Sequence, residues 1–140
     1  MARDQALVVD ASVALKWLVD EISTEKALQV RDHLKEEVIL IVPSLFFYEI
    51  ANVLRYKPEF GINDVKNIIQ TLNNFQFRIE PFKQKLVNLT IDLAYQYYIT
   101  IYDASYIAIG KRDRVDFITA DRKLFSKLNS EQIILLEDCK

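Results

Sequence analysis

The chain has 140 residues, 51% of them hydrophobic and 27% charged, which suits one globular domain with a sizeable core. It contains 2 Gly, 1 Cys and 1 His, and these counts exclude a glycine-rich phosphate loop, a disulfide framework and a zinc site built from several His or Cys ligands. A net charge of −2 argues against coating of nucleic acid by charge alone, although it permits a local basic groove.

The N-terminal segment and the apolar runs bear on location. The N-terminal segment lacks a basic stretch followed by a long apolar run, so no secretory signal is predicted. The longest apolar runs, such as 38–43 and 45–48, are far shorter than the roughly 20 residues that span a bilayer. Since there is neither a repeat nor a linker, residues 1–140 are predicted to form a single domain of a soluble, cytoplasmic protein.

The hydrophobic pattern predicts strands that alternate with helices. In chain order it predicts a strand at 6–9, helices at 12–19 and about 23–35, a strand at 38–42, helices at about 44–57 and 62–73, a strand at 75–79, helices at 82–98 and 103–111, a strand at 117–119, a helix at 121–128 and a strand at 133–136. Ser12 and Ser44 are the predicted caps of their helices, and Pro43 and Pro58 are predicted to end the elements before them.

This alternation predicts an α/β fold, with a mostly parallel central sheet flanked by helices on both faces. The unbroken apolar run at 38–42 is typical of a strand buried on both faces. In such sheets, functional sites form beyond the carboxyl ends of the strands. The residues that directly follow the predicted strands are therefore the first candidates for a site.

Acidic residues occupy several of these positions. Asp10 ends the first strand in VVDAS, and Asp121 follows the strand at 117–119 in ITAD. Asp103 opens a helix in IYDASYIA, after a short extended stretch. Glu49 lies within the helix that follows the strand at 38–42, at the border of its apolar face. Parallel topology would bring the three aspartates, which follow strands or extended chain, to one edge of the sheet.

Each of these acids has a second interpretation. Asp is a preferred helix N-cap, so Asp10, Asp103 and Asp121 each fit a capping role when taken singly. Glu49, taken singly, fits a residue at the edge of a buried helix face. Their coincidence instead favours a site, because crowded carboxylates raise each other's pKa and destabilise the fold unless a cation offsets their charge.

A hard divalent cation, Mg²⁺ or Mn²⁺, is the predicted partner of such a cluster, because it prefers oxygen ligands. A bound cation of this kind lowers the pKa of water to give a nucleophile, and it stabilises charge that develops on a phosphoryl group. Since the chain has one His and one Cys, metal-assisted hydrolysis of phosphodiester bonds is favoured over acyl transfer.

The motifs VVDAS, PSLFFYEIANVLR, YDASYIAIG and FITAD, in this order, resemble those of the PIN-domain nucleases, and most closely the VapC-like ribonuclease toxins of toxin–antitoxin modules. The four acids are separated by about 39, 54 and 18 residues, and the resemblance covers essentially the whole chain. It implies a PIN-like, three-layer α/β/α fold and a metal-dependent endoribonuclease. Asp10, Glu49, Asp103 and Asp121 match the catalytic, metal-binding acids, and Ser12 and Thr119 match polar residues that orient the site. For Ser12, a plain helix cap remains the alternative.

The resemblance also implies partners: an RNA substrate, Mg²⁺ or Mn²⁺, a second copy in a homodimer and a cognate antitoxin protein, with no membrane. Two other functions stay open. One is a non-catalytic PIN-like regulatory module. The other is an aspartyl phosphoryl-transfer domain, which the residues disfavour because position 12 is Ser rather than a second acid.

Weaker candidates flank the acids. Basic residues that follow them are candidates for gripping RNA phosphates, although helix-end pairing and solvation explain them as well; they are Arg55, Lys57, Lys111, Arg112, Arg114, Arg122 and Lys123. Several tyrosines fit either base stacking or, as the favoured interpretation, the core or a homodimer face; they are Tyr95, Tyr97, Tyr98, Tyr102 and Tyr106. The Asp20–Glu21 pair is predicted to be solvated.

Overall fold

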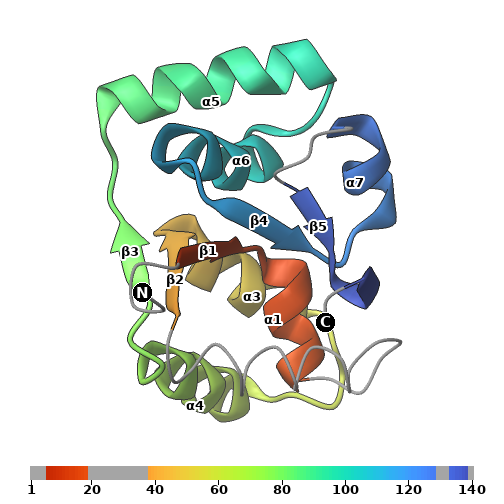
Figure 1. Cartoon of the computed structure of the whole chain (residues 1–140). Coiled ribbons are helices and arrows are strands. Elements are labelled where there is room, and N and C mark those ends of the chain that lie inside the picture. Colours follow the sequence, from red (N-terminus) through yellow and green to blue (C-terminus); the bar gives the residue numbers. More distant parts are fainter. Residues whose placement is uncertain (1–5, 19–37, 129–132, 139–140) are drawn as a thin grey trace.

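A computed structural model describes residues 6–18, 38–128 and 133–138 of the chain (Figure 1). In chain order, its elements are β1 (Ala6–Val9), α1 (Ala11–Leu18), β2 (Ile39–Pro43), α3 (Leu45–Arg55), α4 (Ile62–Asn73), β3 (Arg78–Glu80), α5 (Gln84–Tyr97), α6 (Ile101–Asp113), β4 (Asp116–Thr119), α7 (Arg122–Leu128), β5 (Ile133–Leu135) and the 3₁₀ turn η2 (Leu136–Asp138). No helix in these three ranges is long and apolar enough to cross a membrane.

The strands form one parallel sheet in the order β3–β2–β1–β4–β5. The central strand is β1, where Val8 pairs with Ile41 of β2 on one side and with Phe117 of β4 on the other. Val8 and Val9 are fully buried, as expected for a strand covered on both faces. The predicted α/β class and parallel sheet are confirmed.

Helices cover the two faces of this sheet. On one face, α6 packs across β1, β2 and β4, and α5 packs against α6. On the other face, α1 and α3 contact the sheet and α4 packs on α3. Figure 1 shows the strands between α5 and α6 on one side and α1, α3 and α4 on the other, so the layers are α/β/α.

A cluster of aromatic rings sets the start of β3. The sequence predicts a strand from residue 75, but β3 begins three residues later, because the rings of Phe75 and Phe77 pack with Trp17 instead of extending the sheet. Between them, Gln76 has a φ of 58°, a left-handed conformation that a strand excludes. Tertiary packing therefore overrides the local strand preference at this point.

The boundaries of α5 and α6 also differ from prediction. Helix α5 ends at residue 97, because Tyr98 adopts a φ of 56°. Helix α6 begins at Ile101, two residues before the prediction, and ends when Arg114 adopts a φ of 57°. Neither stop carries the glycine that usually marks a left-handed C-terminal residue, so the sequence held no signal for them.

The predicted helix at 62–73 is confirmed residue for residue. Pro43 is the last residue of β2, where it pairs with Glu80 of β3, so the strand ends at this proline, one residue later than predicted. Ser44 takes the predicted N-cap position of α3, but its side chain makes no capping hydrogen bond, and α3 ends at residue 55 rather than 57. The predicted helix at 23–35, the Asp20–Glu21 pair, His33 and Cys139 lie outside the described residues.

Candidate active site

Asp10 directly follows the central strand and is 5% exposed. Its carboxylate accepts hydrogen bonds from the Ser12 hydroxyl, from the Thr119 hydroxyl at 2.6 Å and from the backbone N–H of Val13 at 3.2 Å. The Val13 bond gives Asp10 the role of an N-cap for α1. Burial raises the pKa of Asp10 to about 6, although the hydrogen bonds from Ser12 and Thr119 act in the opposite direction.

Ser12 and Thr119 tie the end of β1 to the segment that follows β4. The Ser12 hydroxyl accepts a hydrogen bond from the backbone N–H of Ala120, and the Thr119 hydroxyl accepts one from the N–H of Asp121, both at 3.0 Å. Ser12 is the second residue of α1, so the alternative that it caps this helix is wrong, because Asp10 takes that place. Both hydroxyls instead hold the Asp10 carboxylate.

Glu49 lies on α3, half-buried at the border predicted from its helix pattern. The hydroxyl of Tyr106, on α6, donates a hydrogen bond of 2.5 Å to Oε1 of Glu49. Burial raises the pKa of Glu49, the Tyr106 bond lowers it and the charge of Asp103 raises it further. The Glu49 carboxyl is therefore a member of the acidic cluster as well as a neighbour of the core.

Asp103 lies in the first turn of α6, and it does not cap this helix. Thr100 is the N-cap, because its hydroxyl accepts a hydrogen bond of 3.0 Å from the backbone N–H of Asp103. The Asp103 carboxyl is thus not needed for helix capping. Burial and the nearby charge of Asp121 raise the pKa of Asp103, while Thr100 and Lys127 lower it.

Asp121 does cap a helix, as the alternative interpretation predicted. Its Oδ1 accepts hydrogen bonds from the backbone N–H groups of Lys123 at 3.0 Å and Leu124 at 3.1 Å, at the start of α7. The side chain is exposed. Both capping hydrogen bonds go to Oδ1, so Oδ2 is the oxygen of this carboxylate that does not take part in capping.

Asp103 interacts electrostatically with the other three predicted acids, directly or through its effect on their pKa. The charge of Asp103 acts on Asp10 and on Glu49, and the charge of Asp121 acts on Asp103. Each of these three interactions is between like charges, and each raises a pKa. As the side chains lie, the described residues contain no group of three or more acid, His or Cys side chains that is arranged to hold one metal ion.

Lys127 is a cation beside this cluster that the sequence did not single out. Its ammonium group lowers the pKa of Asp103 and donates a hydrogen bond of 3.2 Å to the backbone carbonyl of Tyr98. Its spacing from the acids carries no signal in the sequence, since α7 and the end of α5 meet only in the folded chain. Lys127 gives the acidic site one positive charge.

Arg112, at the end of α6, forms ion pairs within the fold. Arg112 pairs with Glu80 of β3 and with Asp113, and Arg78 of β3 pairs with Asp113 at 2.7 Å. Glu80 is only 8% exposed, so Arg112 neutralises a nearly buried carboxylate. The predicted phosphate contact is not favoured for Arg112, because its guanidinium is already engaged in holding β3 against α6.

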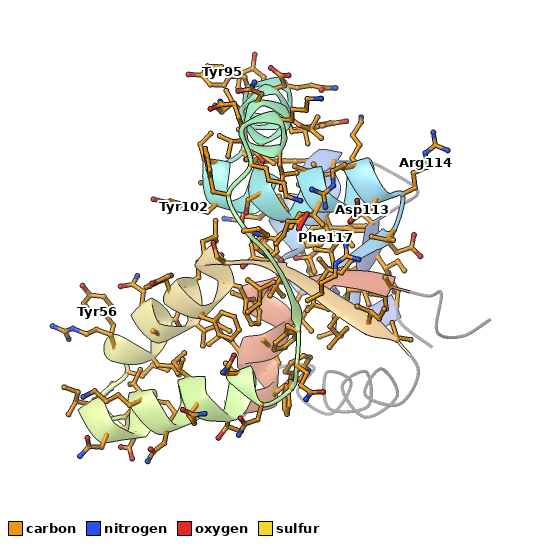
Figure 2. All side chains as sticks on the ribbon, turned by 90° about the vertical axis from the view of Figure 1, so that its left-hand side faces the viewer. Tyr56, Tyr95, Tyr102, Asp113, Arg114 and Phe117 are labelled. Atoms are coloured by element: carbon orange, nitrogen blue, oxygen red, sulfur yellow. The ribbon has the colours of Figure 1, made fainter. Side chains whose placement is uncertain are left out.

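The tyrosines fall into two groups. Tyr106 is 1% exposed and stacks on Phe117, with ring centroids 6.1 Å apart, so its predicted core position is confirmed. Tyr95, Tyr98 and Tyr102 are 78%, 86% and 61% exposed, and Figure 2 shows Tyr95 and Tyr102 pointing away from the sheet. These exposed rings remain candidates for contacts with a partner.

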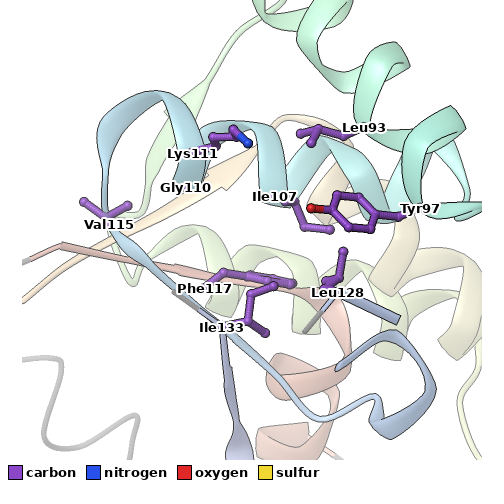
Figure 3. A pocket seen from close by; sticks show the side chains of 9 residues that line it. All are labelled: Leu93, Tyr97, Ile107, Gly110, Lys111, Val115, Phe117, Leu128 and Ile133. Carbon is purple, nitrogen blue, oxygen red and sulfur yellow. The ribbon is translucent and has the colours of Figure 1, made fainter. Parts of the chain in front are cut away.

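A small cavity of about 60 Å³ lies elsewhere, between α5, α6 and the strands β4 and β5 (Figure 3). Its lining is mostly apolar and comprises Leu93, Tyr97, Ile107, Gly110, Lys111, Val115, Phe117, Leu128 and Ile133. None of the four acids lines it. The cavity is therefore separate from the candidate active site.

Comparison with known proteins places this geometry in context. A family model described as PIN domain matches residues 7–130. Ribonuclease VapC3 of Pyrobaculum aerophilum is 29% identical over 126 residues, which cover 86% of this chain and 93% of that protein.

Solved structures share the fold. PAE2754 from Pyrobaculum aerophilum has a TM-score of 0.65 at 23% identity and covers 98% of this chain and 93% of its own. A chain of a toxin–antitoxin complex from Klebsiella pneumoniae has a TM-score of 0.71 at 14% identity, with coverage of 93% and 97%. At these identities, the likeness concerns the arrangement of the elements.

Proposed function

The chain belongs to the PIN-domain family, as its motifs predicted, and we propose that it is a metal-dependent endoribonuclease that hydrolyses RNA phosphodiester bonds. The similarity to Ribonuclease VapC3 over most of both chains supports this activity. The observation that carries the proposal is that three carboxylates interact with that of Asp103, and that the pKa values of Asp10, Glu49 and Asp103 are raised.

The metal would be held by the carboxylates of Asp10, Glu49, Asp103 and Asp121. Their oxygen atoms suit a hard cation such as Mg²⁺ or Mn²⁺, and a positive ion offsets a repulsion that the fold otherwise bears. The bound ion supplies an activated water and stabilises charge on the scissile phosphate. The proposal rests on this donor chemistry and charge, not on a preformed cage of ligands.

The other residues of the site act on the acids. Ser12 and Thr119 hold both oxygens of Asp10 at the end of β1, and they fix the backbone next to Asp121. Lys127 supplies a positive charge for a phosphate group close to Asp103. These contacts orient the acids before substrate binds, which reduces the cost of ordering them during the reaction.

An aspartyl phosphoryl-transfer activity fits these contacts poorly. A phosphate acceptor needs a carboxylate oxygen that an incoming phosphoryl group can reach. Asp10 is 5% exposed, and the hydrogen bonds from Ser12 and Thr119 to its two oxygens weaken it as a nucleophile, although each oxygen keeps a lone pair for a cation. The metal-dependent hydrolase is therefore the better-supported function.

We further propose that the protein is the toxin of a toxin–antitoxin pair, acts in the cytoplasm and forms a homodimer. The fold shared with a chain of the Klebsiella pneumoniae toxin–antitoxin complex supports an antitoxin partner. The exposed rings of Tyr95, Tyr98 and Tyr102 support a protein–protein contact on the α5–α6 side, since tyrosine is enriched at interfaces.

Cleavage of RNA by the purified protein tests the proposal. We expect labelled RNA to be cut with Mg²⁺ or Mn²⁺, and cutting to stop when EDTA is in excess. Cleavage at an unchanged rate in excess chelator would contradict the metal mechanism. Metal binding without cleavage of any RNA tested would leave a non-catalytic regulatory module as the better interpretation.

A further inference from the structure

The hydroxyl of Tyr106 lies between two parts of the candidate site. It donates a hydrogen bond of 2.5 Å to Oε1 of Glu49, which comes from a different helix, 57 residues away in the chain. The backbone N–H of Ala11, the residue after Asp10, lies near this hydroxyl. One oxygen atom on α6 thus lies between the start of α1 and the acid on α3.

Packing fixes the position of this hydroxyl. Tyr106 is 1% exposed, and its ring stacks on Phe117 of β4 at an interplanar angle of 20°. Tyr106 follows Asp103 by three residues on α6, so both side chains project from neighbouring positions on the same helix face. The buried ring of Tyr106 therefore places its hydroxyl beside the acidic residues, on the side that faces the core.

The hydroxyl is the donor of this bond, and it sits on a ring that is 1% exposed. A hydroxyl has one proton to donate, and the bond to Glu49 uses it. This bond engages one lone pair of Oε1 and leaves Oε2 of Glu49 as the oxygen better placed to contact a cation.

We propose that Tyr106 is a positioning residue, which fixes Glu49 through its hydroxyl so that Oε2 is held ready for the divalent cation. This inference rests on the proposed function, since it takes Glu49 to be a metal-binding acid. Groups that orient a metal ligand through a hydrogen bond commonly change metal affinity or activity by about 10–100-fold when removed. A glutamate with several rotatable bonds depends on such a contact more than an aspartate does.

A double-mutant cycle tests this role. Tyr106→Phe keeps the ring but removes the hydroxyl, and Glu49→Ala removes the acid on which it acts. Calorimetry measures the affinity of the purified full chain for Mn²⁺, and RNA cleavage measures kcat and KM separately. We expect Tyr106→Phe to weaken Mn²⁺ binding and lower kcat by about tenfold, with KM nearly unchanged.

In the double variant, we expect no loss of Mn²⁺ affinity beyond that of Glu49→Ala, because the hydroxyl acts through this carboxylate. Additive losses would overturn the proposal, as would a Tyr106→Phe protein with the affinity and kcat of the parent. Tyr56→Phe is the matched control, since it removes a hydroxyl from a ring that is 74% exposed just after α3, and we expect no change.

If Tyr106→Phe does not fold, Glu49→Asp takes its place in the test. It keeps the charge but draws the carboxylate one methylene away from the hydroxyl, so we expect a similar loss of Mn²⁺ affinity; parental affinity would overturn the proposal. If the parent binds Mn²⁺ but cuts no RNA, the ribonuclease function fails while the affinity cycle still tests Tyr106. A parent that binds no Mn²⁺ overturns both.

Discussion

Helix α6 carries an aspartate near each end, and the two ends balance their charges differently. Near the start, burial and the charge of Asp121 raise the pKa of Asp103. At the end, the hydrogen bond and the charge of Arg112, together with Arg78, lower the pKa of Asp113. The residue type and the helix are the same, so the difference comes from what the neighbouring elements present.

This difference separates a structural cluster from a candidate site. The end with Asp113 is already neutralised, because arginines from α6 and β3 pair with its carboxylates. The end with Asp103 gathers carboxylates, and Lys127 is the cation that acts on it. Such an arrangement costs stability, and it is retained where a ligand of opposite charge completes it.

The largest expected effect comes from exchanging each aspartate for asparagine. Asp103→Asn removes a charge from the acidic end, and we expect RNA cleavage to fall by about 10²–10³-fold, as when one charge-stabilising group is lost. The melting temperature of the metal-free variant should be no lower than that of the parent, because one of several repelling carboxylates is gone. Thr100 still caps the helix.

Asp113→Asn is the matched control at the other end. We expect unchanged cleavage and a free energy of unfolding lower by about 0.5–1 kcal/mol, because its ion pairs are partly exposed. If Asp103→Asn stays active, or if both variants lose cleavage equally, the contrast between the two ends has no functional meaning.

A second prediction concerns the stability of the metal-free protein against pH. The pKa of Asp10 is about 6 in the folded chain, above its ordinary value of 3.8, so the folded state holds this proton more tightly. The free energy of unfolding should therefore fall as pH rises from about 4 to about 6, by up to about 3 kcal/mol from this group. Urea unfolding in EDTA measures it.

Asp113, at the end of α6, changes the free energy of unfolding with pH in the opposite direction. Because the pKa of Asp113 is lowered, its stabilising contribution is present above the unfolded pKa and is lost as pH falls below about 4. Asp10→Asn isolates the first effect, since the fall between pH 4 and 6 should become shallower in this variant. Identical slopes for the parent and the variant would show that Asp10 titrates normally.

A smaller effect is expected from Arg112→Gln, which removes the cation that pairs with Glu80. We expect the free energy of unfolding to fall by about 2 kcal/mol, between the values for exposed and buried ion pairs, because Arg112 is 32% exposed and Glu80 is 8% exposed. Cleavage should not change. A loss of cleavage at parental stability would instead return Arg112 to the RNA-binding surface.

The order of the elements and the acidic residues were predictable from the sequence. Hydrophobic periodicity predicted the strands, and parallel topology then placed Asp10, Asp103 and Asp121 near one edge. The caps were less predictable. Ser12 and Asp103 were capping candidates, but Asp10 and Thr100 cap these two helices in the folded chain. The local hydrophobic pattern predicted whether each element is a helix or a strand better than it predicted where the element begins and ends.

Contacts between segments that are distant in the chain could not be predicted from the sequence. The Tyr106–Glu49 bond joins residues 57 apart, and the Arg78–Asp113 pair joins residues 35 apart. Neither spacing has meaning until α6 lies across the sheet. For the same reason, the sequence alone could not show that Arg112 forms ion pairs within the fold and is not available to bind a phosphate.

The central claim is that the acidic end of α6 is a cation site, and titration of the metal-free protein with Mn²⁺ tests it most directly. Calorimetry at several pH values between about 5 and 8 compares the parent with Asp103→Asn. We expect binding to the parent that weakens as pH falls toward the raised pKa of Asp10, and much weaker binding to the variant. Affinity that is independent of pH, or equal in the two proteins, would contradict the account.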